Sequence, residues 1–401
     1  MNPETKTLSA KELEDRYVLP TYSKMPFVLA RAQGNCVFDE TGRRYLDLYG
    51  GHAVSVLGHS HPRWVEALKR QLDRLDFYSA VAYLENRGRA AQWLVEKSYS
   101  SMRQVFFCNS GTEANETALK VARKATGRAE IVALEAGFHG RTLGSLSVTG
   151  TTKLREAFPQ NLAGFTRWVK FGDLAAIASL DASKLAAVIL EPVQSMAGVQ
   201  LAPAEYFRKL REHCSRHGIV LIFDEVQTGA GRTGRWFFGG HVGVEPDLVT
   251  CAKGIGGGFP VGAVIANQAM AATVKPGDQG STFGGGPLAC AAVCASFEIL
   301  ESEGLVALAE KRGAECVRRL QALAGRGLVT AARGLGYLIG VDTTIPAKDV
   351  QARFLKRDIL IGTSDVPGTF RLLPPLTVGE AEWEQFFKAL EEISAEIRNG
   401  A

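Results

Sequence analysis

The sequence predicts an α/β protein with a mainly parallel sheet in a large domain and a smaller α+β domain toward the C-terminus. Short apolar runs typical of buried strands alternate with amphipathic segments over residues 104–260, which is the pattern of a parallel sheet covered by helices. Polar or ionisable residues directly follow several of these runs. Because the carboxyl ends of parallel strands meet at one edge of a sheet, we expect these side chains to surround a ligand.

Length and composition fit an ordinary globular protein. The chain has 401 residues, of which 46% are apolar and 22% charged, enough for a large core. Its net charge of +4 comes from dispersed basic residues, so nucleic acid and membrane surfaces are not expected partners. The start has no signal-peptide core, and no apolar run approaches the roughly 18 residues of a spanning helix. We expect a cytoplasmic protein.

The seven cysteines are scattered and lie mostly inside apolar runs, as reduced core residues do. Cys290 and Cys294 share one face of a predicted helix, and His213, Cys214 and His217 form another group. Neither group has a second ligand pair at a familiar spacing. We therefore expect no metal site.

The first predicted elements precede the sheet. The segment KELEDR favours a helix, and CVFDETGRRYLDLYG alternates around a turn as a hairpin does. A glycine-rich loop then enters an amphipathic helix with Pro62 near its start, where the missing N–H is harmless. Another helix is predicted over Asn86–Lys97, before the first clear strand at Gln104–Cys108.

A polar turn with Ser110, Gly111 and Thr112 follows this strand and precedes apolar residues at helical spacing. Ser110 or Thr112 can cap the helix. Free N–H groups at a helix N-terminus and two hydroxyls suit a phosphate, although an ordinary capped helix has the same pattern. After the next strand, a loop carries Phe138 and Arg141, which can stack on a flat ligand and fork to a carboxylate, or simply pack and face solvent.

Three further apolar runs lead into ionisable residues. LAAVILEP carries Glu191, IVLIFDEV carries Asp224, and PDLVTCAK carries Lys253. Buried charges need partners, because removing a charge from water is costly. Asp224 and Lys253 come in consecutive strand-like units, each followed by a glycine-rich turn. This repetition predicts a functional site, whereas a single Asp or Lys at a strand end would most simply be a solvent-exposed residue.

The C-terminal third begins with a small-residue turn at Ser281 and two long helices. From about Gly334 the pattern predicts an α+β unit, with one strand in GLGYLIGVD, a helix in DVQARFLKRD, strands in ILIGTS and TFRLLPPL, and a last helix over Glu380–Asn399. The predicted domains are an N-terminal arm at 1–45 that contributes to the small domain, a large domain at 46–300 and the small α+β domain at 301–401.

Together, Lys253, Asp224, the Ser110–Thr112 turn and Phe138 would meet the needs of pyridoxal 5′-phosphate. A buried lysine has a lowered pKa and forms a Schiff base as a neutral amine. A carboxylate keeps the ring nitrogen protonated, so that the ring accepts electrons, and a helix N-terminus anchors the phosphate.

The sequence also resembles the class III pyridoxal-phosphate aminotransferases of fold type I. The motifs NSGTEANETALKVAR, FHGRT, LIFDEVQTGAGRTG, PDLVTCAKGIGGGFPVGA and STFGGGPLA occur in the order and spacing of that family, and the likeness runs from about Pro26 to Ile397. The resemblance implies the PLP-transferase fold, an amino donor with 2-oxoglutarate as the acceptor, and a homodimer with shared active sites.

The resemblance assigns a role to each matched residue. Lys253 would be the Schiff-base lysine and proton shuttle, and Asp224 would pair with the pyridine nitrogen. The other implied cofactor contacts are Val226 and Phe138 on the ring faces, Gln227 near the 3-hydroxyl, Ser110, Gly111 and Thr112 at the phosphate, and Thr282 at the phosphate of the neighbouring subunit.

Substrate binding is implied for four residues. Arg141 would bind a substrate carboxylate, and Arg371 would bind the α-carboxylate of the keto acid. Glu191 would shield Arg371, in a pair that opens for 2-oxoglutarate and closes for an amine donor. Ser281 completes this predicted substrate-binding set.

The motifs look most like those of acetylornithine aminotransferases, with departures. Ser195 and Met196 stand where the family commonly has Gly-Glu, and His52 replaces a small aliphatic residue. We expect transfer of the terminal amine of N-acetylornithine, or of a close acylated ornithine or lysine analogue. Alternatives are ornithine, 4-aminobutyrate or another ω-amino acid as donor, then a decarboxylase or aminomutase of the same fold, or a non-catalytic relative.

Overall fold

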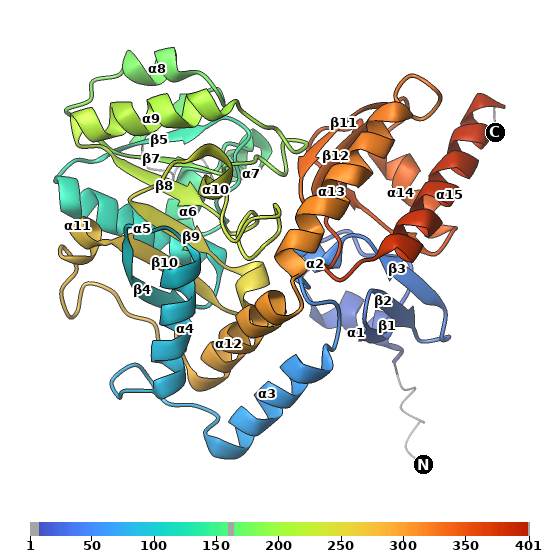
Figure 1. The fold of residues 1–401 in the computed structure, drawn as a ribbon, viewed down its shortest axis with the longest axis horizontal. Coiled ribbons are helices and arrows are strands. Elements are labelled where there is room, and N and C mark those ends of the chain that lie inside the picture. The colour runs from blue at the N-terminus through green and yellow to red at the C-terminus, as the bar shows by residue number, and fades with distance from the viewer. Residues whose placement is uncertain (1–7, 159–163, 400–401) are drawn as a thin grey trace.

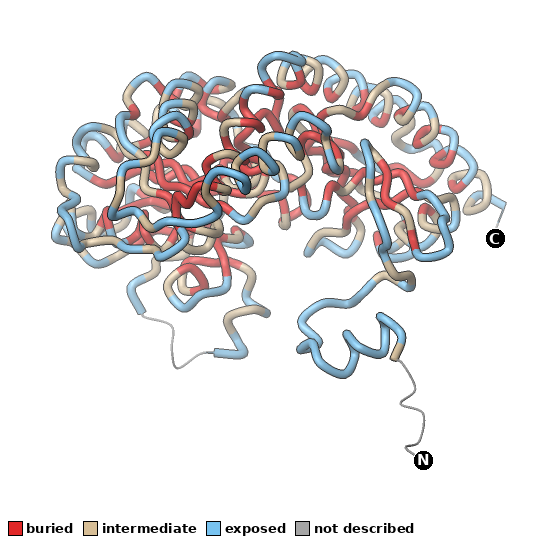
Figure 2. Tube along the Cα trace, turned by 90° about the horizontal axis from the view of Figure 1, so that it is seen from below, coloured by how far each residue is buried: buried red, intermediate tan, exposed pale blue. Residues whose placement is uncertain are grey.

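The computed structural model describes residues 8–158 and 164–399. Across these residues the chain forms a seven-stranded sheet and two four-stranded sheets. Figure 1 shows the large sheet with its helices on the left and the two smaller sheets with α13, α14 and α15 on the right. In Figure 2 the buried segments lie inside both halves, whereas the N-terminal segment around α1 (Ala10–Tyr17) is exposed.

The large sheet has the strand order β4-β10-β9-β8-β7-β5-β6. Pairs β5–β6, β5–β7, β7–β8 and β8–β9 are parallel, and β10 is antiparallel to both of its neighbours. The predicted mainly parallel α/β fold is confirmed. The strands are β4 (Met102–Cys108), β5 (Glu130–Leu134), β6 (Thr166–Val169), β7 (Leu185–Leu190), β8 (Val220–Asp224), β9 (Leu248–Cys251) and β10 (Gly262–Asn267).

Helices cover both faces of this sheet, so its central strands read as continuous apolar runs. Every residue of β7 and β8 is buried, as parallel strands between two helical layers require. One of these helices, α9, ends at Gly218, whose φ of 63° is a left-handed conformation that glycine adopts readily. The covering helices and short turns are α4 (Glu85–Lys97), α5 (Gly111–Thr126), α6 (Leu143–Ser147), α7 (Thr152–Glu156), α8 (Leu174–Ala178), α9 (Ala204–His217), α10 (Gly239–Val242), α11 (Gln268–Ala271), α12 (Pro287–Ser302) and the 3₁₀ turn η2 (Lys253–Gly256).

The second sheet joins the two ends of the chain. The predicted hairpin is confirmed, because β2 and β3 pair antiparallel. β13 then adds to β3 in parallel, with Ile359 opposite Leu46. The predicted domain bounds stay predictions, although residues on both sides of them share this sheet. The elements are β1 (Leu29–Gln33), β2 (Cys36–Asp39), β3 (Arg44–Asp47) and β13 (Ile359–Leu360), followed along the chain from β3 by α2 (Gly50–Ala53) and α3 (Pro62–Arg74).

The third sheet corrects two strand predictions. GLGYLIGVD is not one strand, because β11 and β12 form a hairpin that turns at Gly336 and Tyr337. A Cβ on Gly336, at φ 53°, would lie 2.4 Å from the carbonyl carbon of Thr233, so the turn needs glycine. ILIGTS is also divided, between β13 and β14. The elements are β11 (Val329–Leu335), β12 (Leu338–Thr343), β14 (Gly362–Thr363), β15 (Thr369–Leu372), α13 (Leu305–Ala322), α14 (Ala347–Leu355) and α15 (Glu380–Arg398).

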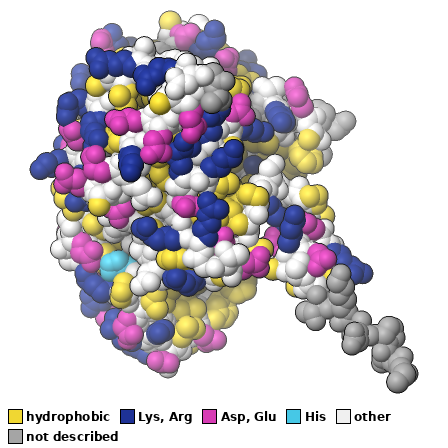
Figure 3. Space-filling view, turned by 90° about the vertical axis from the view of Figure 1, so that its right-hand side faces the viewer, with side chains coloured by type: hydrophobic (Ala, Val, Ile, Leu, Met, Phe, Trp, Pro, Cys, Tyr) yellow, Lys and Arg dark blue, Asp and Glu magenta, His cyan; other side chains and the backbone are white. Residues whose placement is uncertain are grey.

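Over the ranges described above, none of the helices is both long and apolar enough to cross a membrane. Acidic and basic side chains are interspersed on the face that Figure 3 shows, with hydrophobic side chains gathered toward its lower end.

Candidate active site

The carboxyl edge of the large sheet brings the predicted ionisable residues together. Glu191 directly follows β7, Asp224 ends β8, and Lys253 begins the 3₁₀ turn after β9. Asp224 and Glu191 are close enough to Lys253 for their charges to act on its amine. This arrangement follows from the parallel β7–β8 and β8–β9 pairings, which place successive strand ends side by side.

Asp224 is buried and held by three donors. Its Oδ2 accepts from Nδ2 of Asn115 at 2.7 Å and from Nδ1 of His139 at 2.7 Å, and its Oδ1 accepts from the N–H of Val226 at 3.1 Å. Asn115 is oriented in turn by Thr250, whose hydroxyl donates to Oδ1 of Asn115 at 2.6 Å. The carboxylate is therefore fixed in one orientation.

Lys253 combines a strained backbone with an amine that has no partner. Its φ is 47°, an unusual value for a residue with a side chain, and such strain clusters at functional sites. Burial lowers the pKa of Lys253, while the charges of Asp224 and Glu191 oppose that shift. No hydrogen bond or ion pair engages its Nζ within residues 8–158 and 164–399. The side chain is thus a partly buried amine that remains available to a ligand.

The turn after β4 is a capped helix N-terminus, as predicted. Ser110 is the N-cap of the 16-residue helix α5, and its Oγ accepts from the N–H of Glu113 at 3.3 Å. The hydroxyls of Thr112 and Thr142 lie 2.8 Å apart. In the described part of the chain, the N–H groups of Gly111 and Thr112 make no hydrogen bond. They are the free donors that an anion at a helix N-terminus uses.

Val226 and Gln227 follow β8 and lie beside that turn. A Cβ on Gly111 would come within 2.8 Å of both Val226 methyl carbons, so only glycine permits this approach. Oε1 of Gln227 is buried without a hydrogen-bond partner among the described residues. Such an atom is rare unless a ligand or water completes its bonding.

Phe138 and Arg141 lie on the loop after β5. The N–H of Phe138 donates to Oε1 of Glu191 at 2.8 Å. The guanidinium carbon of Arg141 is 6.0 Å from the centre of the Phe138 ring and 5.6 Å from that of Tyr22. Arg141 is exposed, so its guanidinium is accessible at the mouth of the site.

Glu191 and Arg371 do not form the expected pair in this structure. Arg371 is buried in β15, where its Nε donates to the carbonyl oxygen of Thr363 and its Nη1 to Oγ of Ser195, both at 2.8 Å. Burial lowers the pKa of Arg371, and burial raises the pKa of Glu191 to about 7. Glu191 instead accepts from Phe138, so an ionic Glu191–Arg371 contact would require a rearrangement.

Ser281 and Thr282 lie on the loop before α12. Oγ of Ser281 accepts from Nδ2 of Asn109 at 3.1 Å and from the N–H of Gly284 at 3.0 Å, which places Ser281 next to the capped turn. Thr282 is exposed and makes no hydrogen bond within the described residues. Its predicted contact with a neighbouring subunit remains a prediction.

His52 lies in α2 in a left-handed conformation, at φ 67°. Its Nδ1 is 2.6 Å from the Tyr49 hydroxyl. Burial lowers the pKa of His52, and Arg371, Lys253 and Arg141 lower it further through their charges. The departure noted in the sequence therefore faces the same cluster of cations.

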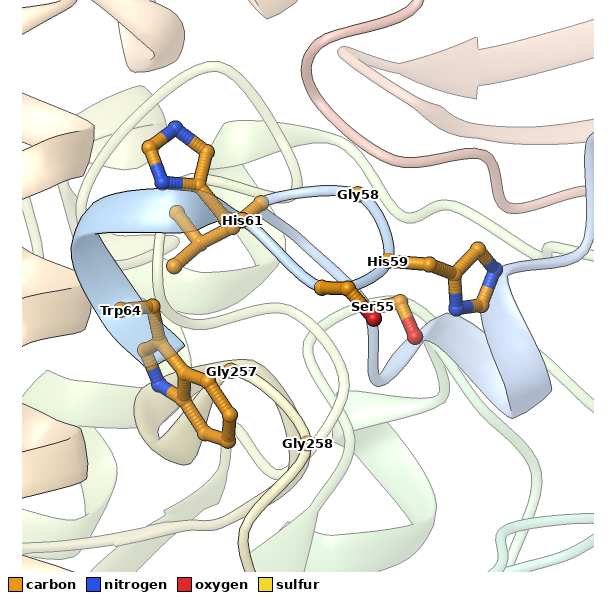
Figure 4. Close-up of a pocket in the computed structure, with 9 residues that line it drawn as sticks. Ser55, Gly58, His59, His61, Trp64, Gly257 and Gly258 are labelled. Atoms are coloured by element: carbon orange, nitrogen blue, oxygen red, sulfur yellow. The ribbon is translucent and has the colours of Figure 1, made fainter. Parts of the chain in front are cut away.

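A cavity of about 280 Å³ lies beside the glycine turn that follows Lys253. Figure 4 shows Trp64 next to Gly257 and Gly258, with His59 on the opposite side. His59 is held by Asp47, whose Oδ2 lies 2.8 Å from Nε2 of the histidine. The cavity is lined by residues other than those of the ionisable cluster described above.

Sequence reasoning missed the partners of the predicted residues. Asn115, Thr250 and His139 were not among the predicted site residues. The one available signal was a polar residue at a buried position, since Asn115 lies among alanines and leucines on the inner face of α5. The sequence shows that Ser195 departs from the residue common in the family, but it does not show that the Ser195 hydroxyl contacts Arg371 of β15.

Comparisons with known proteins agree with this geometry. A family model described as aminotransferase class-III matches residues 17–394. The chain is 45% identical over 392 residues to an acetylornithine aminotransferase of Methanopyrus kandleri, with 98% of this chain and 99% of that protein covered.

Two solved structures are similar over nearly their full length. The ornithine aminotransferase of Toxoplasma gondii has a TM-score of 0.92 and 28% identity, with 99% of this chain and 97% of that chain covered. The acetylornithine aminotransferase of Elizabethkingia anophelis has a TM-score of 0.84 and 30% identity, with 96% and 98% covered. Since the family model and the relative both span almost the whole sequence, the chain belongs to the class III aminotransferases.

Proposed function

We propose that this enzyme transfers the terminal amine of N-acetylornithine, or of a close acylated ornithine or lysine analogue, to 2-oxoglutarate, giving a semialdehyde and glutamate. The observation that carries the proposal is the unpartnered amine of Lys253 beside Asp224 and Glu191, with the buried Arg371 nearby. Curated relatives named acetylornithine aminotransferase, 39–45% identical over nearly the whole chain, support this choice of donor.

The site fits the cofactor of the family, pyridoxal 5′-phosphate. The free N–H groups of Gly111 and Thr112, with Ser110 beside them, would hold its phosphate. The unpartnered Oε1 of Gln227 would accept from a ring substituent, and Val226 and Phe138 would enclose the ring. When bound, the cofactor supplies an electron-accepting ring that stabilises negative charge on the carbon next to the amine.

The chain supplies charge and proton transfer around that ring. Asp224, locked by Asn115 and His139, would hold a proton at the ring nitrogen. Nζ of Lys253, whose pKa burial lowers, would take a proton from one carbon and return it to another. The hydrogen bonds that fix Asp224 and the lowered pKa of Lys253 support these two roles.

Two arginines divide the recognition of carboxylates. Arg141 at the mouth would bind the α-carboxylate of the acylated donor and the distal carboxylate of 2-oxoglutarate. Arg371 inside would bind the α-carboxylate of the keto acid. In each case a guanidinium binds a carboxylate, and the two groups can form two parallel hydrogen bonds when their geometry is favourable.

We further propose a homodimer that shares its active sites, in which Thr282 reaches the phosphate site of the partner. Phe77, Tyr83 and Phe283 are exposed at 40%, 106% and 63%, and the rings of Phe77 and Phe283 are 5.2 Å apart. Exposed aromatic groups of this kind mark protein interfaces. A cytoplasmic location stays a prediction, in keeping with seven free cysteines.

A half-reaction screen tests the donor. The cofactor absorption band is followed while the holoenzyme receives N-acetylornithine, N-acetyl-lysine, ornithine, 4-aminobutyrate or glutamate in turn. We expect N-acetylornithine and glutamate to change the band fastest, and Lys253→Ala to show no such change. A faster response to ornithine or 4-aminobutyrate would assign a different donor, and release of carbon dioxide would assign a decarboxylase.

A further inference from the structure

A side-chain hydrogen bond joins the loop after β7 to the buried arginine of β15. Oγ of Ser195 accepts from Nη1 of Arg371 at 2.8 Å, and the two residues are exposed by only 1% and 2%. We propose that Ser195 is a positioning residue that holds Arg371 ready for a carboxylate throughout the reaction cycle, so that Arg371 does not alternate between substrate and Glu191. This inference rests on the proposed function and concerns its keto-acid half-reaction.

Arg371 is fixed at two of its nitrogens. Besides the bond to Ser195, its Nε donates to the carbonyl oxygen of Thr363 at 2.8 Å, and the backbone of Arg371 lies opposite Gly340 and Gly362 in the sheet. A guanidinium is planar, so two anchored nitrogens fix its orientation. These bonds use two of its five N–H donors, which leaves three for a substrate carboxylate.

Ser195 is held as firmly as the arginine. Its carbonyl oxygen accepts from the N–H groups of Gly198 and Val199, both at 3.1 Å. The next carbonyl, of Met196, accepts from the N–H of Asp365 at 2.8 Å, and Nε of Arg333 donates to the carbonyl of Gly198 at 2.9 Å. The loop is therefore tied to the same sheet that carries Arg371, and the hydroxyl is pre-positioned rather than recruited.

The chemical group that accepts the hydrogen bond from Arg371 determines whether its charge stays available to a substrate. A serine hydroxyl accepts a hydrogen bond without cancelling the positive charge, whereas a carboxylate would cancel it and occupy two donors. Glu191 is engaged by the N–H of Phe138 at 2.8 Å. Among the described residues, the hydrogen-bond acceptors of Arg371 are thus a carbonyl and a hydroxyl, which leaves its positive charge for the carboxylate of a substrate. Glycine, the common residue of the family at this position, has no side chain to act in this way.

The test compares Ser195→Ala and Ser195→Gly with the wild-type holoenzyme. Calorimetry measures the dissociation constant of glutarate, an unreactive dicarboxylate, and steady-state kinetics measure the KM values for 2-oxoglutarate and N-acetylornithine. We expect the affinity for glutarate to fall about three- to tenfold, as for the loss of one hydrogen bond, and the KM for 2-oxoglutarate to rise in parallel. The KM for N-acetylornithine should stay the same or fall. Ser179→Ala, on the outer layer at the end of α8 (Figure 1), is the matched control and should change neither value.

The pH dependence distinguishes positioning from simple loss of packing. In Ser195→Ala the freed N–H of Arg371 would turn to Glu191 and lower its pKa, so the transition in glutarate affinity near pH 7 should move to lower pH. Adding Glu191→Gln should remove that transition. Unchanged glutarate affinity and pH dependence in both Ser195 variants would overturn the inference, as would an equal loss for both substrates. Failure of the wild-type enzyme to bind glutarate would instead overturn the proposed keto-acid substrate, and with it the inference.

Discussion

Asn115 donates from its Nδ2 to Oδ2 of Asp224 over 2.7 Å, linking the second turn of α5 to the end of β8. The helix whose N-terminus we propose to bind the phosphate thus also orients the carboxylate of the neighbouring strand. One rigid element therefore sets the distance between the two groups that would hold opposite ends of the cofactor.

Asn115→Ala should weaken cofactor binding by about tenfold, since Asp224 loses a donor while buried and the Thr250 hydroxyl loses its acceptor. The measurement is the dissociation constant from a titration of apoenzyme with pyridoxal 5′-phosphate. Asn267→Ala is the control, because Asn267 makes a similar bond to Asp247, at 3.0 Å, elsewhere on the sheet. Equal affinities in wild type and Asn115→Ala would refute the orienting role.

Gly111→Ala should reduce cofactor affinity without unfolding the protein. The new Cβ would lie 2.8 Å from the Val226 methyl carbons and must push that side chain toward the ring. Gly88→Ala, in the first turn of α4 with no atom within 4 Å of a Cβ, should instead raise the free energy of unfolding, by at most about 0.5–1 kcal/mol. Titration with the cofactor measures the affinity of both variants, and urea unfolding measures their stability. A Gly111→Ala enzyme with normal cofactor affinity would contradict the close approach.

Glu225 should make the protein less stable as the pH rises toward neutral. This buried carboxyl contacts Tyr99, Thr228 and the N–H of Phe238, and burial raises its pKa from 4.5 to about 7. Since the folded state binds the proton more tightly, the contribution to stability is complete below pH 4.5 and is lost as the pH passes through 7.

Urea unfolding from pH 4.5 to 8 measures this effect. Glu225→Gln, which cannot ionise, should show a smaller fall in the free energy of unfolding over that range than the wild type. Parallel curves for the two proteins would show that Glu225 does not titrate with a raised pKa.

Phe283→Asp should separate the proposed dimer into monomers. The side chain is 63% exposed and packs on Phe77 at 5.2 Å, so a charge there would be buried unpaired in an interface. Sedimentation velocity checks the mass, and activity should fall with it because Thr282 would no longer reach a partner. Leu201→Asp, at an exposed apolar position outside this cluster, is the control. A monomeric wild-type protein would reject the shared-site proposal.

The positions of the strand ends could be read from the sequence because hydrophobic patterning is local. Buried parallel strands appear as continuous apolar runs, so Glu191, Asp224 and Lys253 mark where each run stops. The Ser110 cap is likewise encoded within a few residues. The same local reading overlooked β6 and β10 and took β11 and β12 for one strand, because two apolar stretches around Gly336 differ from one strand only through the backbone conformation of that glycine.

The contacts that tune the site could not be predicted in this way. Asn115 meets Asp224 across 109 positions of the chain, and Ser195 meets Arg371 across 176. Such pairs depend on which elements become neighbours in space, and a buried hydroxyl or amide carries no periodic signal. Glu191 and Arg371 lie in the same site, as expected, but Arg371 donates to the hydroxyl of Ser195 instead of to Glu191.

The parallel pairing of Leu46 with Ile359 has a consequence for how the molecule is made. The hairpin near the start of the chain emerges from the ribosome long before the strand that completes its sheet, whereas the large sheet can form from the residues between them. Closing so long a loop is entropically costly and slow. Arg371 on β15 follows β13 in the chain, so a product that stops before β15 would lack the arginine that we propose to bind the keto acid.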